Sequence, residues 1–294
     1  MRRLLVWSSV AAFALAACAE QQPAGGGGGG GGQPASCEPG SLDLVTTGQL
    51  TIGTDNPAFP PWFEGGTPDG SPWEINDPST GEGYESAVAY AVAEQLGFPV
   101  EQVEWIEVPF NQSFKPGPKD FDFFINQVSY KPARDEAVDF SESYYDVNQA
   151  LVSVEGNEIA DATTLDDLRG GKLGAPIGTT SYDYIVNNIQ PEEEPGVYDT
   201  LNDTISALEN GQIDGVVVDL PTAFFITAVQ IKNGVVVGQF PTVGQQEYFG
   251  MVFEDGNPLV ECVNRALDSV RSDGTLDAIH QRWLADKTNA PVFA

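Results

Sequence analysis

Short apolar runs that are typical of strands alternate with helix-like segments along nearly the whole chain, from about residue 49 to residue 284. Strands that alternate with helices in this way predict an α/β fold with mainly parallel sheets. The predicted strands are Gln49–Thr54, Val103–Val108, Phe121–Ile125, Ala150–Val154, Lys172–Ala175, Gly215–Val218, Val235–Val237 and Tyr248–Phe253. The predicted helices are Ser86–Leu96, Thr164–Leu168, Tyr182–Asn188, Thr204–Asn210, Leu220–Val229, Pro258–Val270 and Thr275–Leu284. The folded part is long enough for one large domain or two of ordinary size.

Polar side chains stand directly after several of these apolar runs. In open α/β sheets, ligands bind beyond the carboxyl ends of the strands, so residues in these positions are candidates for one common site. The candidates are Asp55, Ser129, Arg134, Thr179, Thr180 and Asp219. Each has an ordinary structural interpretation when it is taken alone, and their shared placement is the reason to group them.

Arg134 follows the strand-like run Phe121–Ile125 and its polar end, which contains Asn126, Gln127 and Ser129. The guanidinium group is a planar fork that can bind a carboxylate through two parallel hydrogen bonds. We therefore predict that Arg134 holds the carboxylate of a small molecule. The alternative is a surface arginine in the first turn of a helix, paired with one of the acidic residues that follow it.

Asp219 ends the apolar strand Gly215–Val218, where a buried carboxylate needs a partner. A ligand ammonium group could be that partner, and the alternative is that Asp219 caps the following helix. Thr179 and Thr180 lie at a turn from a strand into a helix, where hydroxyls and backbone N–H groups can bind an anion. The alternative for this turn is again an ordinary helix cap.

A proline-rich loop follows the first strand and presents Asp55, Phe59 and Trp62. Aromatic side chains on a stiff loop form good walls for a small ligand. We therefore include all three residues in the predicted site. The alternative for the two aromatic rings is that they complete the hydrophobic core.

The first 17 residues have the parts of a secretory signal: two arginines, a short apolar core over Leu4–Ala17, and small residues before Cys18. The apolar run is too short to span a bilayer comfortably as a permanent helix. The ending Leu-Ala-Ala-Cys resembles a bacterial lipobox, which implies cleavage before Cys18 and lipid attachment there; an ordinary signal with a chance cysteine is the alternative. Residues 18–40 include a run of eight glycines and form a predicted flexible tether.

Charge and cysteine content exclude some partners and leave one pair of thiols to explain. The net charge of −30 predicts a surface that repels nucleic acid and anionic lipid headgroups. Cys37 and Cys262 remain after Cys18 is assigned to lipid, and outside the cytoplasm such a pair favours a disulfide; two buried free thiols are the alternative. With a single histidine, His280, and no cysteine cluster, the sequence indicates neither a metal site nor a cofactor.

Several longer stretches resemble family 3 of the extracytoplasmic solute-binding proteins, which serve polar amino acid ABC transporters. The resemblance spans nearly all of Leu50–Leu284. It rests on LTIGTDNPAFPPWF, GYESAVAYAVAEQLG, FDFFINQVSYKPARDEAVDFSESYY, GAPIGTTSYDY, GQIDGVVVDLPTA, YFGMVFEDGNPL and SDGTLDAIHQRW. It implies a periplasmic-binding-protein-like α/β fold of type II, in which two lobes close on a ligand like a hinged clamp. The lobes implied are residues 41–147 with 250–294 and residues 149–242, with hinges near 147–150 and 243–249.

Carried over by position, the resemblance also implies roles in binding an amino acid. Arg134 would bind the α-carboxylate, with Ser129 nearby and with further hydrogen bonds from Thr179 and Thr180. Asp219 would bind the α-ammonium group. These residues would therefore hold the part that all amino acids share.

The side chain of the ligand is less well defined by the resemblance. Asp55 and Phe59 match the first-loop acid and the aromatic wall of the family. Gln127 stands where many relatives have glycine or serine, and the segment after Ser129 reads YKPAR instead of the commoner T-x-D/E-E-R. The acid at position 55 and the amides Asn126 and Gln127 favour a polar or basic side chain.

The function implied is that of a monomeric, lipid-anchored receptor on the extracytoplasmic face of a bacterial cell membrane. It would bind a free amino acid and deliver it to the transmembrane subunits of an ABC permease, without catalysis. Two other functions remain open at this point. One is an enzyme similar to cyclohexadienyl dehydratase, built on the same fold, in which Asp55 or Glu85 could serve as acid or base. The other is a receptor domain that senses the ligand without transport.

Overall fold

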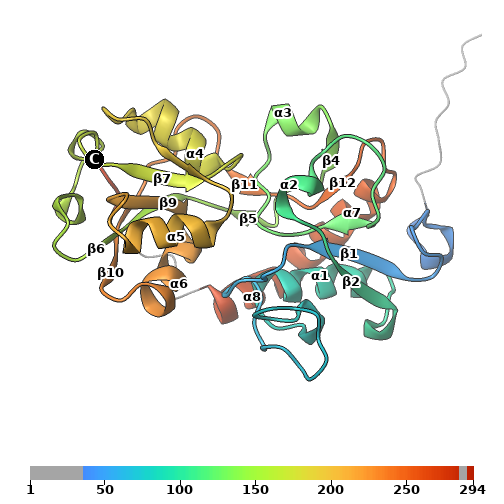
Figure 1. Cartoon of the computed structure of the whole chain (residues 1–294). Helices are drawn as coiled ribbons and strands as arrows, with labels where there is room; N and C mark the ends of the chain where they lie inside the picture. Colours follow the sequence, from blue (N-terminus) through green and yellow to red (C-terminus); the bar gives the residue numbers. More distant parts are fainter. Residues whose placement is uncertain (1–35, 285–289) are drawn as a thin grey trace, which may run out of the picture. The chain divides into compact units, whose positions relative to one another are not determined.

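Two five-stranded sheets and a two-stranded ribbon organise the computed structural model, which describes residues 36–284 and 290–294. The predicted signal peptide, Cys18 and the glycine run lie outside the described residues. Figure 1 shows the ribbon between the two sheets. We call residues 36–144 and 250–284 lobe one, and residues 149–242 and 290–294 lobe two.

The sheet of lobe one has the strand order β2–β1–β3–β12–β4. Its strands are β1 (Leu50–Thr54), β2 (Val103–Glu107), β3 (Phe123–Phe124), β4 (Val138–Phe140) and β12 (Val252–Glu254). Strand β1 is parallel to β2 and β3, while β12 is antiparallel to β3 and β4. Strand β1 is buried along its whole length, as expected of a strand covered on both faces.

The sheet of lobe two has the strand order β10–β6–β9–β7–β8. Its strands are β6 (Gln149–Val154), β7 (Leu173–Pro176), β8 (Gly196–Tyr198), β9 (Gly215–Asp219) and β10 (Gly234–Gln239). Strand β7 is parallel to β8 and β9, while β6 is antiparallel to β9 and β10. The run of three valines in β9 is buried, because it lies in the centre of this sheet.

Both sheets are mixed, whereas the sequence pattern predicted mainly parallel ones. The strands that enter each lobe from the ribbon, β12 and β6, run antiparallel to their neighbours because no crossover helix precedes them. The short strands β4 and β8 were not predicted. The predicted helix Thr164–Leu168 is only a 3-10 turn over Asp166–Leu168.

The ribbon pairs β5 (Tyr145–Asp146) with β11 (Tyr248–Phe249) in an antiparallel register. The predicted strand Tyr248–Phe253 is therefore divided between two sheets: β11 belongs to the ribbon and β12 to lobe one. At the break, a Cβ on Gly250 would lie 3.0 Å from the Ser141 carbonyl oxygen. The chain crosses between the lobes at both of these ribbon strands, close to the predicted hinges.

The helices cover the faces of the sheets. They are α1 (Tyr84–Gln95), α2 (Phe110–Ser113), α3 (Pro132–Asp135), α4 (Thr180–Tyr184), α5 (Leu201–Glu209), α6 (Leu220–Phe225), α7 (Leu259–Ser272) and α8 (Thr275–Trp283). Helices α4 and α6 are each continued by a π turn, Ile185–Ile189 and Ile226–Gln230. Helix α7 buries one face at helical spacing, which is why its sequence predicted it well; the buried residues are Leu259, Cys262, Val263, Ala266, Leu267 and Val270.

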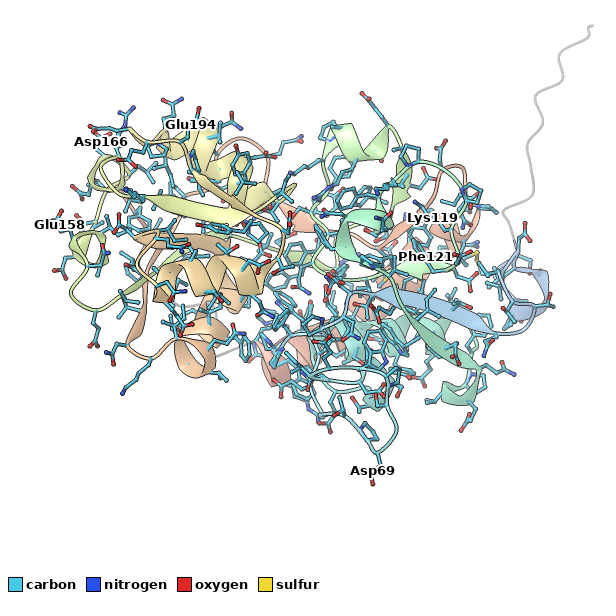
Figure 2. The ribbon with its side chains drawn as sticks, in the orientation of Figure 1. Asp69, Lys119, Phe121, Glu158, Asp166 and Glu194 are labelled. Atoms are coloured by element: carbon cyan, nitrogen blue, oxygen red, sulfur yellow. A yellow bond between two sulfur atoms is a disulfide. The ribbon has the colours of Figure 1, made fainter. Side chains whose placement is uncertain are left out.

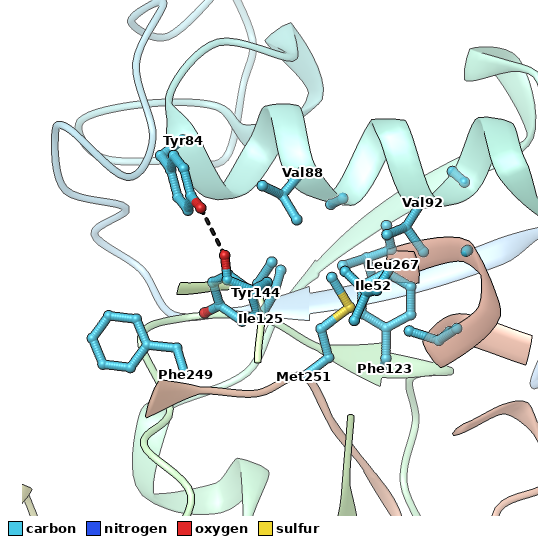
Figure 3. Packing of buried hydrophobic residues seen from close by; sticks show 14 of the residues in the cluster. Ile52, Tyr84, Val88, Val92, Phe123, Ile125, Tyr144, Phe249, Met251 and Leu267 are labelled. Atoms are coloured by element: carbon cyan, nitrogen blue, oxygen red, sulfur yellow. Dashed lines mark hydrogen bonds between the residues drawn. The ribbon is translucent and has the colours of Figure 1, made fainter. Parts of the chain in front are cut away.

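The core of lobe one lies between its sheet and helix α1. Figure 3 shows Val88 and Val92 of this helix facing Ile52 and Phe123 of the sheet and Met251, which directly precedes β12. All five side chains are completely buried. Burying each such side chain stabilises the fold by about 1.5–3 kcal/mol, so this layer gives the site a rigid support.

Helix α1 begins at a close approach between Gly83 and the loop that follows β1. A Cβ on Gly83 would lie 2.4 Å from the Phe63 Cα, and the glycine φ is +96°. Other residues would therefore be strained and would clash there. The approach lets the N–H groups of Tyr84 and Glu85 donate to loop carbonyl oxygens, which fixes the loop against the helix.

Cys37 and Cys262 form the predicted disulfide. It joins the start of the described chain to helix α7, and Cys37 packs against the core of lobe one. Cys37, which lies within the predicted tether, is therefore bound to lobe one. The prediction of a disulfide is therefore confirmed, and the alternative of two buried free thiols is not.

The last residues, 290–294, belong to lobe two, although the sequence assigned them to lobe one. Val292 bridges to Gln239 at the end of β10, and Phe293 stacks on Phe240 with ring centres 5.0 Å apart. The Ala294 N–H donates to the Thr163 carbonyl oxygen. Nothing in these few residues signals this location, because their partners lie more than fifty positions away along the chain.

Acidic side chains project outward over the surface. Figure 2 shows Asp69, Glu158, Asp166 and Glu194 pointing outward from the backbone, and all four are exposed. This placement accounts for much of the charge without burying it. Within the described part of the chain, no helix is long and apolar enough to cross a membrane.

Candidate functional site

A cavity of ≈ 430 Å³ lies between lobe one and lobe two. This volume is in the range of small-molecule sites. Nine of the ten residues predicted to bind the ligand line it: Asp55, Phe59, Asn126, Gln127, Ser129, Arg134, Thr179, Thr180 and Asp219. The structure therefore brings together residues that lie up to 164 positions apart, at the carboxyl ends of β1, β3, β7 and β9.

Arg134 is a buried cation from lobe one. Its side chain is only 7% exposed, so it is not the surface residue of the alternative interpretation. Nη1 donates to the Ser129 carbonyl oxygen at 2.6 Å, and Nη2 donates across the cavity to the Gly178 carbonyl oxygen at 2.8 Å. None of the ion pairs between described residues includes Arg134. Its remaining N–H groups can therefore receive an anion.

Two aromatic rings hold the Arg134 guanidinium in place. Its central carbon lies 4.4 Å from the centre of the Phe114 ring and 5.7 Å from that of Phe110. Such stacking favours a cation and keeps the guanidinium plane fixed. Burial lowers the pKa of Arg134 to about 10, so the group stays charged at neutral pH.

Asp219 is a half-buried carboxylate from lobe two. It stands at the end of β9 and at the N-cap of α6, yet its side chain makes no capping hydrogen bond, so it is free of the structural role considered above. Instead, Gln149 Nε2 donates to Asp219 Oδ1 at 2.6 Å. Burial raises the pKa of Asp219 well above its usual range, and the nearby carboxylate of Glu247 raises it further. A cation placed here would favour its ionised form.

Asp55 adds a second carboxylate on the lobe-one side. The Asn56 N–H donates to Asp55 Oδ1 at 2.9 Å. Burial raises the pKa of Asp55, and Glu107 raises it in the same direction. Asp199 of lobe two also lines the cavity and is exposed. The cavity therefore carries three carboxylates and one guanidinium.

Gln127 is held by a buried acid behind the cavity. Its backbone N–H donates to Glu85 Oε1 and its Nε2 to Glu85 Oε2, both at 2.6 Å. Tyr144 also donates to Glu85, which is completely buried. Burial raises the pKa of Glu85 to about 7. These contacts hold Gln127 at a φ of +46°, a conformation that needs such support.

The Thr179–Thr180 turn caps a helix and also lines the cavity. Thr179 Oγ1 accepts from the Tyr182 N–H at 3.2 Å and so caps helix α4. Thr180 Oγ1 lies 3.4 Å from Ser129 Oγ of lobe one. Both threonines line the cavity. The turn is therefore a helix cap that also faces the site.

Trp62 does not line the cavity, which corrects its inclusion in the predicted site. Its side chain is completely buried in the core of lobe one and packs edge-to-face against Tyr84, Tyr145 and Phe249. Its indole Nε1 donates to Thr222 Oγ1 of lobe two at 3.0 Å. Trp62 thus supports the loop and bridges the lobes.

Direct contacts connect the lobes around the cavity. Lys131 Nζ of lobe one lies 2.6 Å from Asp183 Oδ2 of lobe two. With the Trp62–Thr222 and Arg134–Gly178 hydrogen bonds, this pair bridges the two sides of the cavity. These three contacts hold the two lobes against each other beside the cavity.

Sequence reasoning missed Asp199 in the lining of the cavity, and it missed four residues that contact the predicted site residues. Phe110 begins the short helix α2 and Phe114 follows its end, and only their contact with Arg134 reveals their role. Gln149 begins β6, and Glu247 precedes β11, so both lie on the crossovers. No local pattern distinguishes them from ordinary polar residues.

Comparison with known proteins agrees with this geometry. The family described as bacterial extracellular solute-binding proteins, family 3, matches residues 51–286. A putative ABC transporter arginine-binding protein 2 of Escherichia coli (strain K12) is 31% identical over 157 residues, which are 52% of this chain and 61% of that protein. The L-cystine-binding protein TcyJ of the same strain is 34% identical over 173 residues, or 58% of this chain and 63% of that protein. The chain thus spans less than two thirds of either relative.

A solved structure, described as an ancestral arginine-binding protein bound to arginine, has the same fold. It superimposes with a TM-score of 0.64 and 26% identity, covering 81% of this chain and 99% of that one. The family match extends over both lobes and the ribbon. This chain therefore belongs to family 3 of the bacterial extracellular solute-binding proteins.

Proposed function

We propose that the protein binds a free amino acid in this cavity and delivers it to the transmembrane subunits of an ABC permease. One observation carries the proposal: a buried guanidinium from lobe one, Arg134, and a half-buried carboxylate from lobe two, Asp219, face a single cavity. An α-amino acid carries a carboxylate and an ammonium group on one carbon atom. It would neutralise both charges at once, which few other small molecules can do.

The carboxylate of the ligand would be held by Arg134 through two parallel hydrogen bonds. The Thr179–Thr180 turn lies across the cavity and would add donors from lobe two. Ser129 and Thr180 are in contact across the cavity, so the turn lies close to lobe one. A ligand carboxylate would therefore be bound by Arg134 of lobe one and by the turn of lobe two. Such binding favours the closed arrangement, because only the closed state offers all the donors.

The ammonium group would pair with Asp219. The pKa of this carboxyl is raised in the empty cavity by burial and by Glu247. A ligand cation offsets both causes, so the ammonium would be selected over a neutral group. Asp219 and Arg134 therefore account for the part that all amino acids share.

The ligand side chain is proposed to be basic. After Arg134 and Asp219 are neutralised by the ligand, Asp55 and Asp199 remain in the lining without a cation of their own among the described ion pairs. A guanidinium or ammonium at the end of the side chain would compensate this charge. Phe59, with Phe225 at a ring distance of 6.4 Å, offers an apolar wall for the methylene chain. The names of the arginine-binding relatives support the same class.

The location follows the family description as extracellular. We propose that the mature chain is a monomer attached to the extracytoplasmic face of the membrane by lipid on Cys18, with the following glycine run as a tether. Mass spectrometry of the mature protein tests this: a mass without the lipid, or an N-terminus other than residue 18, would contradict the anchor.

Isothermal titration calorimetry against the twenty proteinogenic amino acids tests the central proposal. We expect 1:1 binding, with the greatest affinity for arginine or lysine. The absence of heat with every amino acid would refute amino acid binding. A preference for an acidic amino acid would refute the basic class while leaving the carboxylate and ammonium contacts standing.

The dehydratase alternative is not favoured by the geometry. It needs an acid or base beside the ligand, and Glu85, one of the two candidates, is completely buried behind Gln127 and does not line the cavity. Asp55 alone remains. Turnover of prephenate or arogenate by the purified protein would reinstate the enzyme.

A further inference from the structure

Glu247 lies behind the cavity on the second crossover, next to strand β11. Ser129 Oγ donates to Glu247 Oε1 at 2.5 Å, and Gln149 Nε2 lies 3.3 Å from each of its carboxylate oxygens. Glu247 does not itself line the cavity, whereas Ser129 does. It therefore contacts the ligand site through other side chains.

The hydrogen bond to Glu247 determines what Ser129 can offer a ligand. A serine hydroxyl has one proton and two acceptor lone pairs. An ionised carboxylate only accepts, so the Ser129 proton is directed at Glu247 and away from the cavity. The lone pairs of Ser129 then remain for a donor. Without Glu247, the Ser129 hydroxyl could turn its proton toward the ligand ammonium group. The hydroxyl proton and the ammonium protons would then repel each other.

The orientation of Gln149 is fixed in the same way. Ser181 Oγ donates to Gln149 Oε1 at 2.6 Å, so the amide nitrogen is on the opposite side. That nitrogen donates to Asp219 at 2.6 Å and is close to Glu247. Gln149 and Ser129 are therefore the two side chains that connect Glu247 with the ammonium end of the cavity.

The backbone keeps Glu247 in this position. Its carbonyl oxygen accepts from the Val147 N–H at 3.0 Å, and the next residue, Tyr248, pairs with Asp146. Glu247 is thus part of the second crossover, and its backbone is hydrogen-bonded to the first. Its carboxylate therefore lies between the two lobes.

We propose that Glu247 is a positioning residue that makes Ser129 a hydrogen-bond acceptor for the ligand ammonium group. The inference rests on the proposed function and extends it to the crossover between the lobes. The Glu247 side chain contacts Ser129 and Gln149, whereas Arg134, which would bind the ligand carboxylate, donates to the Ser129 and Gly178 carbonyl oxygens. Loss of Glu247 should therefore weaken ligands with an ammonium group and spare those without one.

The test compares L-arginine with 5-guanidinopentanoate, which is the same molecule without the ammonium group. Calorimetry is performed with wild type, Glu247→Ala, Glu247→Gln and the control Asp146→Asn. The control removes one carboxylate from the same ribbon, where Asp146 is exposed. L-glutamine and 4-carbamoylbutanoate replace the pair if wild type prefers glutamine. Thermal unfolding first shows that each variant is folded.

We expect Glu247→Ala to weaken L-arginine about tenfold or more, the effect of losing a charged hydrogen-bond partner. Its affinity for 5-guanidinopentanoate should stay within about twofold of wild type, a change of less than about 0.5 kcal/mol. Glu247→Gln should recover most of the loss, because its amide oxygen can still accept from Ser129. A merely structural role would weaken both ligands equally.

A double-mutant cycle gives a second criterion. If Glu247 acts through Ser129, then Ser129→Ala with Glu247→Ala should lose little more than Ser129→Ala alone. Equal losses for both ligands, full additivity, or a Glu247→Gln variant as weak as Glu247→Ala would overturn the inference. A wild type that binds no amino acid would instead overturn the proposed function, and this inference with it.

Discussion

Replacing Arg134 by alanine removes the buried cation that faces the cavity. The side chain is 7% exposed and stacks on Phe114, so its charge is held where water cannot screen a ligand carboxylate. Removing one partner of a buried, hydrogen-bonded charge pair costs about 2–5 kcal/mol. We therefore expect the dissociation constant of the preferred amino acid to rise about 30-fold to several thousand-fold.

Arg134→Lys separates charge from geometry. Lysine keeps the positive charge but lacks the planar fork. It cannot bond the carbonyl oxygens of Ser129 and Gly178 and also bind a carboxylate through two parallel hydrogen bonds. We expect an affinity between those of wild type and Arg134→Ala.

Calorimetry with the preferred amino acid measures both changes. Arg271→Ala is the matched control, since it removes the same charge from an exposed position where Arg271 Nη1 lies 2.7 Å from Asp268. The control should bind as wild type does. If folded Arg134→Ala bound within about threefold of wild type, less than about 0.7 kcal/mol, the carboxylate assignment would be refuted.

Three further predictions concern charge and stability. Because the pKa of Asp219 is raised in the empty cavity, ammonium binding should release protons, and affinity should fall as the pH is lowered. Calorimetry in buffers of different ionisation enthalpy should detect the released protons. If no protons are released, the pairing of Asp219 with the ammonium group is contradicted. Asp55→Asn should weaken arginine or lysine more than a neutral amino acid, as a binding series would show. Replacing Cys37 and Cys262 by serine should lower the free energy of unfolding by about 2–5 kcal/mol without changing affinity, as denaturation and calorimetry can measure.

Residues of the site that lie beside an apolar strand could be predicted from the sequence. Asp55, Ser129 and Asp219 each follow or end such a run, and strand ends meet at one edge of a sheet. Trp62 could not be placed, because a tryptophan on a loop after a strand can face either the core or the ligand. The core of lobe one encloses it completely.

Residues that act through distant partners required the tertiary structure. Glu247 has no strand or helix pattern of its own, and its role depends on Ser129, 118 positions earlier in the chain. The final segment, residues 290–294, pairs with Gln239 although it follows the helices of lobe one. Neither contact leaves a periodic signal, since side-chain periodicity reports only which face of one element is buried.

By itself, the sequence determined the alternation of strands and helices, the two cysteines of the disulfide and the charges that follow the apolar strands. These features are local, because they depend on hydrophobic period, residue type and position in an element. The tertiary structure decided that Arg134 and Asp219 face one cavity from opposite lobes and that Trp62 is core. The place where two elements meet depends on how the whole chain packs, and burial there then raises the pKa of groups such as Asp219.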